Sequence, residues 1–270
     1  MAMVPPITFT ISGTPDMTRP LSEQVVLVSG AGRGLGAAIA TAFVREGAQV
    51  VVNYRASRTQ AEALAAQLGP RARAIQADVR DADQVQAMFE VVRRTMGPVT
   101  TLVHNALTDY RFNGDARDTI ATLTPERLRG QTDTACVGAL LLLQQAVSEM
   151  TALGFGRVIT IGSNLVQHPV VPYHDYTSAK SALLALTRTA AAELGPHGIT
   201  VNMVSGGLLR TTDASAATPD AVFDLIAANT PLRRVTTPDE LAETVLFFAS
   251  PWARAVTGQN LIVDGGLVFG

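Results

Sequence analysis

The 270-residue sequence contains one cysteine, Cys136, and this excludes a fold held together by internal disulfide bonds. Cys136 lies in the apolar stretch 135–140, which indicates a packed thiol rather than a nucleophile. The cysteine and the four histidines show no metal-ligand spacing, so we expect no metal site. Such sparing use of cysteine suits a reducing cytoplasm, where we expect the protein to reside.

The chain also lacks an excess of either charge and lacks long apolar runs. Its 21 basic and 23 acidic residues give a net charge of −2, and the basic residues are scattered, so no nucleic-acid partner is expected. The longest apolar run, 139–143, is far shorter than the roughly 18–20 residues of a membrane span. Residues 1–22 are rich in proline and have no basic start followed by an apolar block. We expect them to form a weakly structured extension.

The feature that is present is an alternation of short apolar runs with longer amphipathic stretches. The apolar runs predict strands at 25–28, 49–52, 73–75, 101–103, 158–161, 199–201 and 261–263. Helices are predicted at 37–46, 58–67, 83–95, 125–151, 173–194 and 238–248. Nearly continuous apolar strands separated by helices indicate a parallel sheet covered on both faces. The sequence therefore predicts an α/β fold, with residues 23–270 forming a single doubly wound Rossmann-type domain around a mostly parallel sheet of about seven strands.

A glycine-rich stretch, 29–36, follows the first predicted strand and leads into a helix. Gly30, Gly34 and Gly36 would let the backbone turn tightly and approach a pyrophosphate, with Leu35 in the same loop. The free N–H groups of the following helix would then face the phosphates. This placement between a strand and a helix predicts a dinucleotide site.

The residues around the second strand favour NADP(H) as the cofactor. No Asp or Glu follows that strand to bind the ribose 2′-hydroxyl of NAD. Arg33 in the glycine loop and Arg55 after the strand could instead hold a 2′-phosphate, because a guanidinium matches phosphate geometry. NAD(H) is the alternative cofactor, since Arg33 and Arg55 could also be ordinary solvated surface charges.

A second group of residues carries acid–base chemistry. Tyr176 and Lys180 are four residues apart and share one face of a predicted helix. An ammonium beside a phenol favours the phenolate and lowers its pKa, which would let Tyr176 exchange a proton with a substrate oxygen. The hydroxyl of Ser163 could hold the same oxygen.

Together these residues resemble the classical short-chain dehydrogenase/reductase family, and most of all its 3-oxoacyl-acyl-carrier-protein reductase branch, over residues 23–270. The resemblance implies hydride transfer between a nicotinamide and a carbonyl or secondary alcohol, with Ser163, Tyr176 and Lys180 as catalytic residues. It also implies a homotetramer formed through the long helices and the last strand. With Arg33, Leu35 and Arg55 from the loops described above, and the residues that the resemblance adds, the predicted cofactor contacts are Gly30, Arg33, Gly34, Leu35, Gly36, Arg55, Asp78, Val79, Asn105, Ala106, Tyr176, Lys180, Gly207 and Thr211.

Three residues depart from the family pattern. Ala135 stands where the long helix usually carries an Asn that helps to hold a water, so a proton relay there would need another route. Leu107 replaces the Gly of the family's Asn-Ala-Gly segment and is expected to crowd the loop near the cofactor. Gly206 replaces a Pro and is expected to loosen the backbone that leads to the substrate.

The substrate side is predicted less sharply. We expect a covering segment at 208–234 with a short helix near 219–228. The substrate would be a small-molecule carbonyl compound, with an acyl thioester as one candidate. A catalytically weak or inactive NADP-binding sensor or subunit is the alternative function, favoured by Ala135 and Leu107. Polar residues that could line the substrate pocket or meet an anionic substrate are Asn164, Gln167, His168, His174, Arg210, Arg233 and Arg234.

Overall fold

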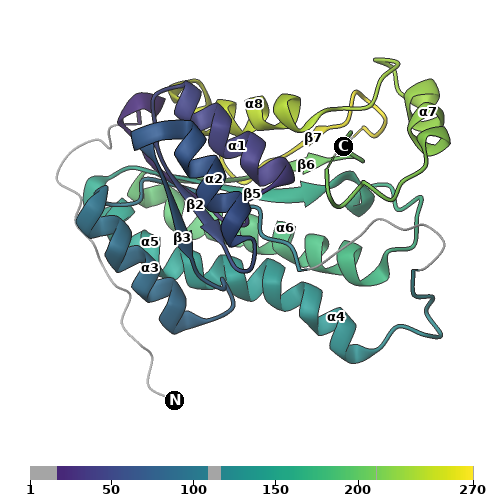
Figure 1. Ribbon diagram of the computed structural model, residues 1–270, viewed down its shortest axis with the longest axis horizontal. Helices are drawn as coiled ribbons and strands as arrows, with labels where there is room; N and C mark the ends of the chain where they lie inside the picture. The colour runs from purple at the N-terminus through teal and green to yellow at the C-terminus, as the bar shows by residue number, and fades with distance from the viewer. Residues whose placement is uncertain (1–16, 109–116, 211, 270) are drawn as a thin grey trace.

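The computed structural model describes residues 17–108, 117–210 and 212–269. All seven strands of its single sheet run parallel, in the order β3-β2-β1-β4-β5-β6-β7 (Figure 1). The chain therefore crosses over once, between β3 and β4, from one half of the sheet to the other. The strands are β1 Val25–Val28, β2 Gln49–Tyr54, β3 Ala72–Gln76, β4 Thr101–His104, β5 Gly156–Ser163, β6 Ile199–Gly206 and β7 Asn260–Val263.

Helices cover both faces of this sheet, as its nearly continuous apolar strands predict. One layer contains α1, α2 and α8, and the other contains α3, α4, α5 and α6 (Figure 1). The helices are α1 Gly34–Arg45, α2 Arg58–Leu68, α3 Ala82–Thr95, α4 Pro125–Thr132, α5 Gly138–Leu153, α6 His174–Leu194, α7 Asp220–Asn229 and α8 Pro238–Ala249.

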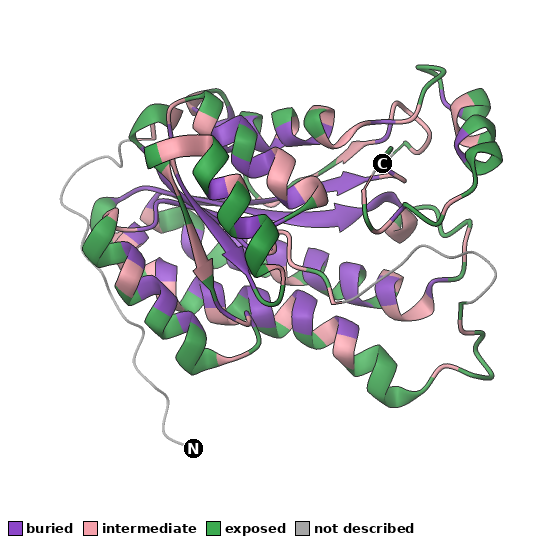
Figure 2. Ribbon diagram, in the orientation of Figure 1, coloured by how far each residue is buried: buried purple, intermediate pink, exposed green. Residues whose placement is uncertain are grey.

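The core consists of two apolar layers, one on each side of the sheet. Val26, Val50 and Ile39 belong to the layer beneath α1 and α8, whereas Leu27 and Phe89 belong to the layer beneath α3 and α5. Successive strand residues point to opposite faces, so strands that are buried throughout must supply both layers. In Figure 2 the central strands are accordingly buried, whereas most of α7 is exposed.

The doubly wound sheet confirms the predicted fold class, and the predicted strands and helices are present with shifts at their ends, the largest being in β6, which was predicted to end at residue 201 and continues to Gly206. One local feature differs from the expectation of a regular helix over 125–151. The helix continues from Pro125 to Leu153 but contains one π-helical turn, Asp133–Val137, between α4 and α5. A π-turn inserts one residue into the helix without ending it, so the apolar periodicity around it gives little sign of its presence.

The helix Pro125–Leu153 is long and apolar enough to cross a membrane. The sequence did not predict this, because the longest uninterrupted apolar run in the helix is only 139–143. In the fold this helix packs against α3, α6 and the sheet. A core helix of a soluble protein passes the same test of length and composition, so the finding is a weak indication of a membrane span.

The described end of the N-terminal extension is attached to the domain. The buried guanidinium of Arg157 donates a hydrogen bond to the Met17 carbonyl (2.9 Å). Arg19 lies over the ring of Phe155, 5.0 Å from its centroid, and Leu21–Glu23 form a short 3₁₀ turn. These contacts lie before residue 23, where the sequence places the start of the domain.

Candidate active site

A cavity of about 750 Å³ opens at the carboxyl ends of the strands, beside the adjacent strands β1 and β4, where the strand order reverses. In an open parallel sheet, ligands bind at this position. The loops after β1, β2, β3, β4 and β6 line it, together with two residues of α6. All of the predicted cofactor residues lie in its wall except Thr211, which falls outside the described residues.

The glycine loop forms one side of this cavity. Gly30 and Gly34 have φ values of +64° and +55°, which favour glycine. A Cβ on Gly36 would lie 2.4 Å from the Gly30 carbonyl oxygen, so the first turn of α1 tolerates no side chain there. A close glycine turn followed by the N-terminus of a twelve-residue helix fits a pyrophosphate. The cavity therefore has the cradle that a dinucleotide needs.

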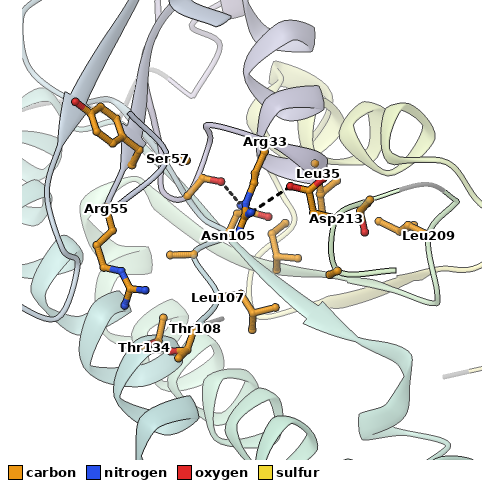
Figure 3. A pocket seen from close by; sticks show the side chains of 18 of the residues that line it. Arg33, Leu35, Arg55, Ser57, Asn105, Leu107, Thr108, Thr134, Leu209 and Asp213 are labelled. Carbon is orange, nitrogen blue, oxygen red and sulfur yellow. Dashed lines mark hydrogen bonds and ion pairs between the residues drawn. The ribbon is translucent and has the colours of Figure 1, made fainter. Parts of the chain in front are cut away.

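Two arginines reach this cavity from neighbouring loops (Figure 3). Arg33 forms an ion pair with Asp213 (3.2 Å), and both side chains are exposed. The hydrogen bond from Arg80 is the largest cause that lowers the pKa of Asp78, and the charge of Arg55, which follows β2, is a smaller one. Positive charge thus lies beside the second strand, where the ribose of a dinucleotide would bind.

Asn53 has a role that the sequence did not reveal. Its buried side chain accepts a hydrogen bond from Gly30 N–H (3.4 Å) and donates one to the Ala77 carbonyl (3.1 Å). The Asn53 amide thereby joins the glycine loop to the end of β3 through hydrogen bonds to backbone groups. Because both partners are backbone atoms, no pattern of side chains could have indicated this role.

The three predicted catalytic residues come together where β5 meets α6. Ser163 is the last residue of β5, and Tyr176 lies in the first turn of α6. The two hydroxyls share a hydrogen bond, and the Lys180 ammonium lies 5.7 Å from the centroid of the Tyr176 ring. Tyr176 and Lys180 line the cavity directly. The arrangement can hold one substrate oxygen between the hydroxyls of Ser163 and Tyr176.

The electrostatics of Tyr176 differ from the expectation that Lys180 lowers its pKa. Burial raises the pKa of Tyr176 to about 12, and the hydrogen bond with Ser163 offsets only part of this effect. A phenol in an apolar setting resists ionisation because the phenolate loses its hydration. In this structure Tyr176 is therefore a proton donor at neutral pH.

Lys180 is the cation next to this phenol. Its ammonium donates a hydrogen bond to the Ile161 carbonyl (2.7 Å), which holds the side chain along the end of β5. Burial lowers the pKa of Lys180 to about 8. The ammonium is thus mostly protonated at neutral pH, and it loses its proton as the pH rises through about 8.

The three residues that depart from the family pattern lie in the cavity wall, in the π-turn and at the end of β6. Leu107 extends into the cavity, as expected for a side chain that reshapes the loop (Figure 3). Ala135 lies in the π-turn and belongs to the same buried apolar cluster as Ala179. The expectation that Gly206 loosens the backbone is wrong at that residue, because it ends β6 and is paired with β5 and β7.

The polar residues expected on the substrate side are mostly engaged elsewhere. Asn164 donates a hydrogen bond to the buried carboxylate of Asp264 (2.9 Å), which fixes the C-terminal segment beside Ser163. Among the described residues that line the cavity, none is Gln167, His168 or His174.

The three arginines proposed to meet an anionic substrate have partners within the chain. Arg210 pairs with Asp220 (2.9 Å), and Arg234 pairs with Glu240. Arg233 donates a hydrogen bond to the Ala228 carbonyl. These contacts connect each of the three arginines to a neighbouring part of the chain.

Comparisons with known proteins agree with this geometry. A family described as enoyl-(acyl-carrier-protein) reductase matches residues 30–268. The 3-oxoacyl-[acyl-carrier-protein] reductase FabG of Staphylococcus aureus (strain Mu50) is 34% identical over 245 residues, covering 89% of this chain and 96% of that protein. The chain belongs to the short-chain dehydrogenase/reductase family. It is thus an oxidoreductase by family membership.

Other short-chain dehydrogenases/reductases show the same breadth of similarity. The 3-oxoacyl-[acyl-carrier-protein] reductase of Synechocystis is 34% identical over 254 residues, which cover 92% of this chain and 98% of that protein. A short-chain type dehydrogenase/reductase of Picea abies is 32% identical over 258 residues, covering 92% of this chain and 93% of that protein. The crystal structure of a putative gluconate dehydrogenase from Agrobacterium tumefaciens has a TM-score of 0.84 at 27% identity, covering 92% of this chain and 97% of that one.

Proposed function

We propose that this protein is an NADP(H)-dependent oxidoreductase that interconverts a carbonyl compound and a secondary alcohol. The observation that carries the proposal is the hydrogen-bonded pair Ser163–Tyr176, placed beside Lys180 at the edge of a dinucleotide-sized cavity. A bound nicotinamide would supply or accept the hydride. The names of the relatives make a 3-oxoacyl thioester the first substrate to test.

In the reductive direction each side chain has a defined task. The Tyr176 hydroxyl delivers its proton to the substrate oxygen, and its raised pKa keeps that proton in place at neutral pH. The Ser163 hydroxyl donates a hydrogen bond to the same oxygen, where negative charge develops. The Lys180 ammonium stabilises the phenolate that Tyr176 becomes after proton transfer.

The preference for NADP(H) rests on the positive charge beside the second strand. Arg33 and Arg55 line the cavity there, and Asn53 cannot accept the ribose hydroxyls as a free carboxylate would. A 2′-phosphate would gain charge-assisted hydrogen bonds from either guanidinium.

A homotetramer in the cytoplasm completes the proposal. The long helix exposes the apolar side chains of Val137, Leu140 and Leu153, and Leu261 of β7 is exposed as well. Burying these side chains against copies of the chain would be favourable. Light scattering coupled to size-exclusion chromatography tests this state, and a monomer at micromolar concentration would contradict it.

The activity is tested by following NADPH oxidation with a panel of carbonyl compounds. The panel contains acetoacetyl thioesters, simple ketones and sugar-derived ketones, with an enoyl thioester included because of the matched family's description. We expect turnover of at least one ketone. Tight NADPH binding without turnover of any member would contradict the proposal and favour the cofactor-sensing alternative.

A further inference from the structure

His104 is a buried histidine that the reaction described above does not use. It ends β4 directly before Asn105, and only 1% of its surface is exposed. Its Nδ1 lies 3.2 Å from the Ser29 hydroxyl oxygen, and its Nε2 lies 3.1 Å from the Thr134 carbonyl oxygen. One ring thereby connects the glycine loop with the π-turn Asp133–Val137.

The chemistry of the partners fixes the proton on the ring. A carbonyl oxygen only accepts, so Nε2 must carry the hydrogen that is donated to Thr134. The Ser29 hydroxyl oxygen already accepts from the backbone N–H groups of Asn105 and Ala106, both at 3.0 Å. Its own hydrogen is therefore directed to Nδ1 of His104. Every hydrogen bond in this network has a donor and an acceptor only in the neutral Nε2–H tautomer.

The surroundings keep His104 neutral. Burial, together with the smaller effect of the nearby positive charge of Lys180, lowers the pKa of His104 to about 3. A protonated ring would repel the Lys180 ammonium and would leave the Ser29 hydroxyl without an acceptor.

At the glycine loop, the network fixes the strand ends that hold the cofactor cavity open. The Ser29 hydroxyl accepts hydrogen bonds from the backbone N–H groups of Asn105 and Ala106. The Asn105 side chain in turn donates hydrogen bonds to the Ser29 and Gly30 carbonyls (3.0 and 3.1 Å). A Cβ on Gly30 would lie 3.0 Å from the Ala106 Cα, so these two loops are in close contact.

At the π-turn, the network reaches the catalytic helix. The Cys136 sulfur lies 3.9 Å from the Ala179 carbonyl oxygen, and Ala135 belongs to the same buried apolar cluster as Ala179. Ala179 directly precedes Lys180 in α6. The position of the π-turn therefore affects the position of the ammonium next to Tyr176.

We propose that His104, as the neutral Nε2–H tautomer, is a positioning residue that holds the glycine loop through Ser29 and the Lys180 region through Thr134. The proposal rests on the proposed function for its kinetic consequences. Two conservative substitutions separate the two ends, because an Asn amide can replace Nδ1 and a Gln amide can replace Nε2.

The kinetic test compares these two variants in the intact protein. His104→Asn keeps an acceptor for Ser29 and loses the bond to Thr134, so we expect kcat to fall about tenfold with NADPH affinity near that of the wild type. His104→Gln keeps the donor to Thr134 and loses the acceptor for Ser29, so we expect NADPH to bind about tenfold more weakly with kcat nearly unchanged. Ser29→Ala should weaken NADPH binding in the same direction and more strongly, because it also leaves the N–H groups of Asn105 and Ala106 without their acceptor.

A second measurement does not depend on activity. Nitrogen NMR of histidine-labelled protein, with the His104 signals assigned by their loss in His104→Asn, should show a protonated Nε2 and an unprotonated Nδ1 between about pH 6 and pH 9. The Nδ1–H tautomer or a titrating ring would overturn the proposal even if no substrate is known. Wild-type kinetics in both variants, or equal losses of kcat and affinity in both, would also overturn it.

Discussion

The two walls of the cavity are built in different ways. On the cofactor wall, buried polar side chains such as Asn53 and Asn105 are hydrogen-bonded to backbone atoms. On the opposite wall, the covering segment 208–234 carries exposed ion pairs such as Arg210–Asp220, and its helix α7 is largely exposed (Figure 2). Buried hydrogen bonds define one geometry, whereas exposed ion pairs contribute little to stability. We therefore expect the cofactor wall to be preformed and the other wall to adapt to substrate.

The largest effect should come from Gly36→Ala on the cofactor wall. The added Cβ would lie 2.4 Å from the Gly30 carbonyl oxygen, so the loop has to move and cofactor binding should be lost. Gly130→Ala in α4 is the matched control, since a Cβ there meets nothing within 4 Å. Isothermal calorimetry with NADPH measures both variants. Normal binding by Gly36→Ala would show that the loop is not preformed.

Lys180→Met should abolish most turnover while it stabilises the fold. Burial lowers the pKa of Lys180 from 10.5 to about 8, so the folded state disfavours the ammonium at neutral pH. Removing the charge should raise the melting temperature at neutral pH by about 2 °C or more. An unchanged or lower melting temperature would contradict this account of the burial of Lys180.

The same shift predicts two pH dependences in the wild type. Between about pH 8 and pH 10.5 the unfolded chain holds the Lys180 proton and the folded protein does not, so folding stability rises with pH in this window. Reductase turnover should fall as pH rises through about 8, because the cation next to Tyr176 is lost. Urea unfolding and kcat across this range measure both. In Lys180→Met the rise in stability should be absent.

Arg55→Ala should have an intermediate effect that is confined to one cofactor. We expect NADPH affinity to fall about 10- to 100-fold, as for the loss of a charge-assisted hydrogen bond, with NADH affinity nearly unchanged. Arg58→Ala is the control, since that arginine pairs with Glu62 outside the cavity. Equal weakening of NADPH and NADH would refute a phosphate-binding role.

The smallest effect should come from Asp220→Asn on the adaptable wall. The exposed Arg210–Asp220 pair should contribute less than about 1 kcal/mol to folding stability, and NADPH affinity should stay at the wild-type value. Thermal unfolding and calorimetry measure both quantities. A severalfold change in NADPH affinity would show that the two walls are coupled.

The difference between the walls also explains what the sequence could predict. The sheet follows from apolar runs such as 25–28, and the glycine loop follows from backbone needs that only glycine meets. Tyr176 and Lys180 were found because their spacing places them on one helical face. These features depend on neighbours close in sequence.

The features that the sequence did not predict depend on contacts between distant segments. His104 joins residues 75 positions before it and 30 positions after it, and Asn53 bonds to backbone groups of other loops. The raised pKa of Tyr176 follows from burial, which the i,i+4 spacing to Lys180 does not encode. The only sequence signal for His104 was a histidine directly before Asn105-Ala106 at the end of a strand.

The most direct test of the account is turnover by Tyr176→Phe with saturating NADPH and the best ketone of the panel. The account predicts that kcat falls about 10²- to 10⁴-fold while the Kd for NADPH stays unchanged, because only the proton donor is removed. Turnover within about twofold of the wild type would contradict the assignment of Tyr176 as the proton donor, and with it the proposed reaction.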